Sequence, residues 1–219
     1  MAITYDEKSA LRIETGGSIV EGAGGIAVVV LAIISLAEAV PSSALIAIAV
    51  IVLGVAFLAE GGAIAAEFSR LLGAGTGTMS RIDLGGGMIL EWLGGVALAA
   101  LGILSLVGVV PGVLIPAAVI TGGAVLMLSS GTLVEMNEFR MRSTAFPEAY
   151  RGLLGASVSG AVAIQVLAGA AAIVLGILAF TGTGAGTLMF SQIGLLVLGS
   201  ALVIGAGTLT GNLIRMFRH

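Results

Sequence analysis

The sequence predicts an all-α integral membrane protein, a six-helix bundle built from three tandem helical hairpins in a pseudo-threefold arrangement. Its composition is the first reason, because 58% of the 219 residues are hydrophobic and only 10% are charged, with a mean hydropathy of +1.18. A soluble domain carries about 25% charged residues, which solvate its surface. Lipid must therefore solvate the flanks of this bundle. Six long apolar stretches and an internal repeat complete the prediction.

Each apolar stretch is long enough to cross a bilayer, which takes about 20 residues. Within a pair, short breaks at Pro41, at Pro111 and at 181–184 permit a tight reversal, since proline and glycine end helices. Longer polar connections, over 69–86 and 139–155, are expected between the pairs. The six predicted spans are 18–40, 43–66, 87–110, 113–136, 156–180 and 187–213.

An internal repeat relates the three hairpins. Sliding the chain by 70 residues superposes the first hairpin on the second, and a third copy follows 74 residues further on. Glu21 thus matches Glu91, which Gln165 replaces in the third copy. We interpret residues 1–219 as one transmembrane domain with an N-terminal cytoplasmic segment and three repeats: 1–16, then 17–68, 87–139 and 160–215.

The positive charges predict the topology. All nine Lys and Arg residues fall in the termini or in the connections between hairpins, and the three hairpin tips contain none. Positively charged segments stay on the cytoplasmic side of a membrane. The sequence therefore predicts a multi-pass protein of the cell (inner) membrane with both termini in the cytoplasm.

Several function classes are disfavoured. A net charge of −3 argues against nucleic-acid binding, which needs a concentrated basic surface. The chain has no cysteine, and its single histidine, His219, is the last residue, so thiolate or histidine metal sites and a catalytic dyad are not expected. We expect a non-enzymatic protein without a cofactor or metal. Its expected partner is the lipid bilayer. Further copies of the chain or other membrane subunits are additional candidate partners.

Small residues recur at four-residue spacing, which lets two helix backbones approach closely in lipid. The Ser and Thr residues within the spans, such as Ser35 and Ser129, are expected to hydrogen-bond back to their own helix. The small-residue rows expected to form helix contacts are Gly152, Ala156 and Gly160; Ala168, Ala172 and Gly176; and Gly207 and Gly211.

The repeat unit resembles that of the HdeD-type acid-resistance membrane proteins. A Gly-rich first helix runs into Leu-Gly-Ile-Leu at 101–104 and 175–178, Pro111 marks the turn, and a second Gly-rich helix follows. The resemblance covers roughly residues 17–217. It implies a six-helix inner-membrane protein linked to membrane integrity or acid-stress tolerance, with no catalytic residues to carry over. A membrane-embedded assembly subunit is an alternative role.

Carboxylates within the spans form a candidate proton or cation site, because a charge in hydrocarbon costs about 2.5–3.5 kcal/mol on insertion scales. Glu21 and Glu60 each lie about 20 residues from the tip of the first hairpin, at one level near the cytoplasmic boundary. With the two equivalents of Glu21 they would form a polar ring in a small channel or transporter. The candidate residues are Glu21, Glu60, Glu91 and Gln165, with Glu67 and Glu138 deeper toward the cytoplasm.

A structural interpretation competes with this site. The same residues could end their helices at the interface, with Glu21 and Glu91 in the first helical turns, where the helix dipole favours negative charge. They would then pair with arginines of the termini and connections, namely Arg70, Arg81, Arg142 or Arg215.

A rotor-type proteolipid is a further alternative. Such a subunit needs a carboxylate in the middle of the membrane on the second helix of its hairpins. Here Gly131 and Gly205 match Glu60 in the other two copies, so the sequence disfavours this role.

Overall fold

The computed structural model confirms the all-α class. Within the residues that it describes there are six α-helices and no strand. The backbone is described for 5–37, 43–73, 81–143 and 148–216, and side chains for 19–37, 43–62, 89–130 and 160–207. The helices are α1 (Tyr5–Ala37), α2 (Ser43–Gly73), α3 (Arg81–Leu106), α4 (Pro111–Ser143), α5 (Glu148–Thr181) and α6 (Ala185–Met216).

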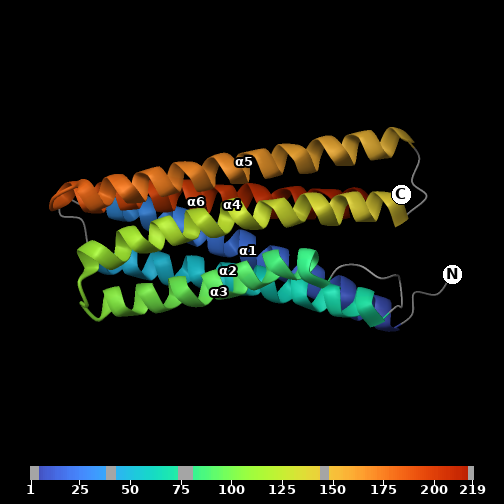
Figure 1. The fold of residues 1–219 in the computed structure, drawn as a ribbon, viewed down its shortest axis with the longest axis horizontal. Coiled ribbons are helices and arrows are strands. Elements are labelled where there is room, and N and C mark those ends of the chain that lie inside the picture. Colours follow the sequence, from blue (N-terminus) through green and yellow to red (C-terminus); the bar gives the residue numbers. More distant parts are fainter. Residues whose placement is uncertain (1–4, 38–42, 74–80, 144–147, 217–219) are drawn as a thin grey trace.

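The six helices run up and down along one long axis, as Figure 1 shows. The start of α1 and the end of α6 lie at the same end of the bundle, which we call the terminal end. The opposite end, where α1 meets α2, α3 meets α4 and α5 meets α6, is the hairpin end. This order matches the three predicted hairpins.

The helices are longer than the sequence predicts. They contain between 26 and 34 residues, which at about 1.5 Å per residue exceeds the roughly 30 Å of a hydrocarbon core. The predicted polar connections 69–86 and 139–155 are therefore wrong in extent, because the helices on either side continue into them. The start of α1 at Tyr5 lies within the N-terminal segment 1–16, whose cytoplasmic location stays a prediction. Hydropathy marks where water replaces lipid, whereas Glu, Arg, Leu and Ala continue a helix readily in either solvent.

Each of the six described helices contains a stretch long and apolar enough to cross a membrane. The stretches confirm the predicted number of spans within the residues that the structure describes. They are Ile19–Ala37, Ser43–Gly62, Ile89–Leu106, Pro111–Ser130, Gly160–Thr181 and Ala185–Gly207.

The second helix of each hairpin lies at the centre of the bundle. The helices α2, α4 and α6 contact one another, and each of α1, α3 and α5 packs against two of them from outside. Half of each inner span is buried, compared with 28%, 33% and 22% of the spans in α1, α3 and α5. The outer helices therefore present most of their surface to lipid, and the inner ones enclose the core.

Three glycine pairs bring helices of different hairpins into backbone contact. A Cβ atom built on Gly25 would lie 2.8 Å from the carbonyl oxygen of Gly199, and one on Gly54 would lie 2.8 Å from that of Gly95. The third pair is Gly123 with Gly169, where the corresponding distance is 2.6 Å. Only glycine permits this approach, because any side chain would separate the helices.

The predicted small-residue rows have mixed outcomes. Ala172 and Gly176 of α5 do pack closely, against Gly123 and against Ile120 and Pro116 of α4. The prediction is wrong for Gly160 and Gly207, where an added Cβ would meet no atom of the described residues within 4 Å. Gly152, Ala156 and Gly211 lie outside the described side chains. Spacing alone does not say which face of a helix a row of glycines occupies.

The turn between α3 and α4 forms at the predicted proline. Gly108 has φ +93° and Val110 has φ +35°, so the chain reverses through a left-handed backbone. Pro111 then begins α4 at a position where the missing N–H leaves no hydrogen bond unmade.

Candidate functional site

The first helices of the three hairpins each carry a buried polar side chain one turn from a contact glycine. Glu21, Glu91 and Gln165 precede Gly25, Gly95 and Gly169 by four residues. Residues four apart share a face of a helix, so each polar side chain lies on the face that makes the closest helix contact. All three are almost fully buried, with exposed fractions of 2% for Glu21, 0% for Glu91 and 3% for Gln165.

The inner helices bring three further residues to the same level. Glu60, Ser129 and Gly205 each follow a contact glycine (Gly54, Gly123 or Gly199) by six residues. Because neighbouring helices are antiparallel, these positions lie on the same side of the glycine pairs as Glu21 and its equivalents. Glu60 and Ser129 are buried, with 9% and 4% exposed. We call the six residues Glu21, Glu60, Glu91, Ser129, Gln165 and Gly205 the carboxylate cluster.

The members of this cluster are close enough to interact across the bundle. Glu21 lies within electrostatic range of Glu60 and Glu91, and Glu91 lies next to the Ser129 hydroxyl. A Cβ atom built on Gly205 would lie 3.0 Å from Nε2 of Gln165 and 3.2 Å from Oε1 of Glu21. The absence of a side chain at Gly205 thus lets these two groups reach the backbone of α6.

Most oxygens of the cluster have no hydrogen-bond donor. Among the described residues, the unpartnered buried atoms here are Oε1 of Glu21, Oε2 of Glu60, both oxygens of Glu91 and Oε1 of Gln165. The described side chains include these three acidic residues and no Lys or Arg. Buried polar groups are normally paired, and an unpaired one points to strain, function or a bound partner. The cluster is therefore a concentration of acceptors without matching donors.

The interfacial interpretation is wrong for Glu21 and Glu91. Glu21 lies sixteen residues inside α1 and Glu91 ten residues inside α3, so neither occupies a first helical turn. Arg70 and Arg81 are each ten residues from the glutamate of their own helix, about 15 Å along the axis. The side chains of these arginines lie outside the described residues. Arg142 and Arg215 are at least as far beyond Ser129 and Gly205.

Two predicted site residues do not lie at the level of the cluster. Glu67 is seven residues beyond Glu60 on α2, about 10 Å toward the terminal end, and Glu138 is nine residues beyond Ser129 on α4. Their side chains lie outside the described residues. In contrast, Glu21, Glu60, Glu91 and Gln165 all lie 15 to 17 residues from the hairpin ends of their helices, at about 24 Å.

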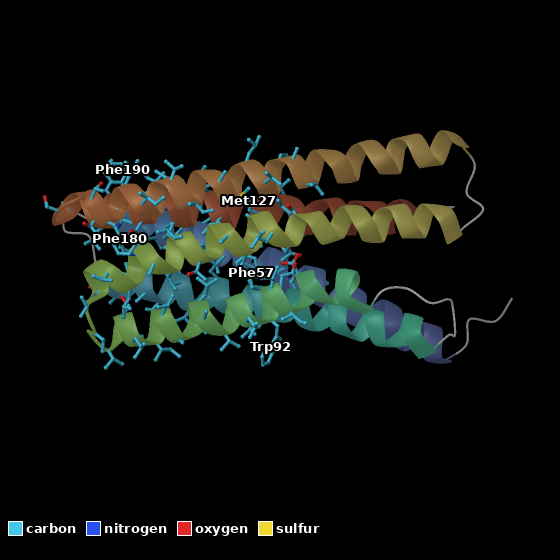
Figure 2. All side chains as sticks on the ribbon, viewed as in Figure 1. Phe57, Trp92, Met127, Phe180 and Phe190 are labelled. Carbon is cyan, nitrogen blue, oxygen red and sulfur yellow. The ribbon has the colours of Figure 1, made fainter. Side chains whose placement is uncertain are left out.

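An apolar layer separates the cluster from the hairpin end. Phe57, one turn from Glu60, is fully buried (Figure 2). Beyond it, Leu53, Leu98 and Leu198 surround Gly122, whose Cβ position is 3.0 Å from Leu198 and 3.3 Å from Leu53. We call Leu53, Leu98 and Leu198 the leucine layer. Trp92 points away from the bundle in Figure 2 and is 54% exposed, as an interfacial anchor would be.

A second buried polar contact lies beyond the leucine layer. The Gln192 side-chain amide donates a hydrogen bond of 2.6 Å to Oγ of Ser35. The sequence predicts that Ser and Thr side chains in the spans hydrogen-bond back to their own helix. This prediction is confirmed for Ser129, Ser130 and Thr121. At Ser35 it omitted the hydrogen bond from Gln192. The prediction also missed Ser129 and Gly205 as cluster members, since only their spacing from the contact glycines identifies them.

No group of three or more His, Cys, Asp or Glu residues among the described side chains has the geometry of a metal site. No protein-family model matches the chain, and no curated protein or solved structure is significantly similar to it. The fold itself defines the class: six apolar helices make this chain a polytopic α-helical membrane protein that contacts the lipid bilayer.

Proposed function

We propose that this membrane protein binds and releases protons at the carboxylate cluster. The observation that carries the proposal is the burial of three carboxyl groups together, at 0–9% exposure, with no Lys or Arg among the described side chains. A charge without a partner in a low-dielectric interior is unfavourable by several kcal/mol. Protons remove this charge and at the same time turn acceptor oxygens into donors.

The positions of the contact glycines support a pseudo-threefold arrangement of the hairpins as part of this proposal. Each glycine pair has a polar residue four positions before its outer member and a cluster residue six positions after its inner member. A threefold axis would place one pair of cluster positions in each repeat. The first two repeats contribute Glu21 with Glu60 and Glu91 with Ser129, whereas the third contributes Gln165 with Gly205.

The cellular role follows from the predicted topology and resemblance. With both termini on the cytoplasmic side of an inner membrane, the cluster lies nearer to the cytoplasmic surface than to the opposite surface. A proton-binding cluster there suits the HdeD-like role in acid tolerance that the repeat pattern implies. We propose that this role is non-enzymatic.

The pH dependence of stability tests proton binding. If the folded cluster holds protons that the unfolded chain releases, the free energy of unfolding rises as pH falls, by up to about 1.4 kcal/mol per pH unit for each proton. Thermal unfolding of the purified protein in detergent, followed by its helical circular dichroism, measures this slope. We expect a reduced slope for the variant combining Glu21→Gln, Glu60→Gln and Glu91→Gln, which keeps the side-chain shape. Equal slopes in the two proteins would contradict proton binding at the cluster.

The leucine layer predicts that the bound protons do not pass through the bundle. Leu53, Leu98 and Leu198 are fully buried, and a Cβ atom built on Gly122 would contact all three, so apolar side chains border the cluster on its hairpin side among the described residues. Liposomes containing the protein should dissipate an imposed pH gradient no faster than protein-free liposomes, as reported by a dye in the lumen. A proton leak that the triple glutamine variant abolishes would instead identify a conductor.

A further inference from the structure

We infer that the carboxylate cluster also takes one monovalent inorganic cation, and that the cation and a proton compete for it. The inference rests on the proposed function, since it requires protons at the same cluster. The ligand class is an alkali metal ion or ammonium, held by carboxylate oxygens and by the amide oxygen of Gln165.

Charge balance leads to competition. The titratable groups that face the cluster are Glu21 on α1, Glu60 on α2 and Glu91 on α3. At the same level α4, α5 and α6 contribute Ser129, Gln165 and Gly205, which carry no charge. A buried cluster of three ionised carboxylates is neutral only when it has gained three positive charges. Three protons satisfy this condition, and so do two protons with one monovalent cation, so an entering cation releases one proton.

Gln165 is the independent observation that points to a cation. Its side chain is 3% exposed, and Oε1 has no hydrogen-bond partner. An amide oxygen does not take up a proton near neutral pH, but it is a good ligand for hard cations, as carboxylates are. The third repeat thus supplies a neutral oxygen where the first two supply Glu21 and Glu91, which suits a site that must bind a cation without adding charge.

Gly205 positions two of the proposed ligands. Without a side chain there, Oε1 of Glu21 and Nε2 of Gln165 both lie close to the same point of α6. The Glu21 carboxyl group and the Gln165 side-chain amide therefore approach each other from α1 and α5, the two outer helices that pack against α6.

Proton release upon cation addition tests the inference. The purified protein in weakly buffered detergent solution is titrated with NaCl, KCl or NH4Cl while a pH-sensitive dye reports free protons. We expect saturable proton release with at least one of these salts, and none with N-methylglucamine chloride or with choline chloride, whose cations are too large. Proton uptake after a small addition of acid is measured on the same samples and reports the proposed function separately.

The Gln165→Met variant removes the amide oxygen and keeps all three carboxyl groups. We expect it to need an about 10- to 100-fold higher cation concentration for half-maximal proton release. Leu167→Met is the matched control, because Leu167 lies on the same helix and is 70% exposed. Its titration should equal that of the wild type.

Each outcome decides between the two proposals. Proton uptake with no cation-dependent release overturns the competition and leaves the proposed function intact. Equal release with N-methylglucamine shows an effect of ionic strength, which also overturns the competition, and an unchanged titration of Gln165→Met overturns the assigned site. The absence of both uptake and release in the wild type overturns the proposed function as well.

Discussion

Replacing Gly169 with alanine is expected to lower the free energy of unfolding by about 1–3 kcal/mol, the range for overpacking a tight contact. The new Cβ atom would lie 2.5 Å from the carbonyl oxygen of Gly123 and 3.0 Å from the backbone nitrogen of Met127. Neither is the flexible end of a side chain, so α4 and α5 must move apart. That separation also weakens the packing of Ala172 and Gly176 along the same face.

The sign of this effect is informative, because alanine is otherwise the better helix former by about 1 kcal/mol. Gly160→Ala is the matched control on the same helix, since its Cβ would meet no atom within 4 Å. We expect the control to be neutral or slightly stabilising. The measurement is thermal unfolding of both variants in the same detergent, followed by circular dichroism. Equal effects of Gly160→Ala and Gly169→Ala would show that α4 and α5 are not in backbone contact.

The sequence places the polar residues of the three first helices in one register, and the reason is physical. Glutamate and glycine at a spacing of four recur in the first two copies, and Gln165 with Gly169 keeps the spacing in the third. Such a pair places a polar group beside a close helix contact on one face. The same spacing could have predicted burial, because a residue on the contact face is directed to a neighbouring helix, whereas a residue elsewhere faces lipid.

Two features could not be predicted because apolar sequences constrain them weakly. The second helices are so rich in small and aliphatic residues that sequence alignment matched Glu60 to Gly131, whereas spacing from the contact glycines matches it to Ser129. The positions at which the helices begin and end near the terminal end of the bundle were also not predicted. Charged residues there indicate that lipid has given way to water, but they do not stop a helix, so α2 and α4 continue into the predicted loops.

The error in the helix ends had one consequence for the site. Placing the helix starts near residues 17 and 87 put Glu21 and Glu91 in first turns, where a helix dipole would explain them. With α1 beginning at Tyr5 and α3 at Arg81, that explanation no longer applies. What remains is burial of acidic residues inside a membrane bundle, which calls for a neutralising ligand.

Phe57→Ala is expected to destabilise the bundle by about 2 kcal/mol, and the comparison with Phe180→Ala tests the membrane setting at the same time. Phe57 is fully buried between the helices, so its truncation leaves a cavity with lost dispersion contacts. Lipid is as apolar as the phenyl ring, so the transfer part of the usual cost for a soluble protein largely cancels and the cavity part remains.

Phe180 is 45% exposed near the hairpin end of α5, where lipid can replace the ring. We therefore expect Phe180→Ala to change the free energy of unfolding by less than about 0.5 kcal/mol. Thermal unfolding of both variants in one lipid-detergent mixture gives the comparison. The cavity in Phe57→Ala also lies one turn from Glu60, where entering water could hydrate the carboxylates. A smaller dependence of stability on pH in Phe57→Ala than in Phe180→Ala would show that dryness around Glu60 keeps protons in the cluster, whereas equal dependences would place that control elsewhere.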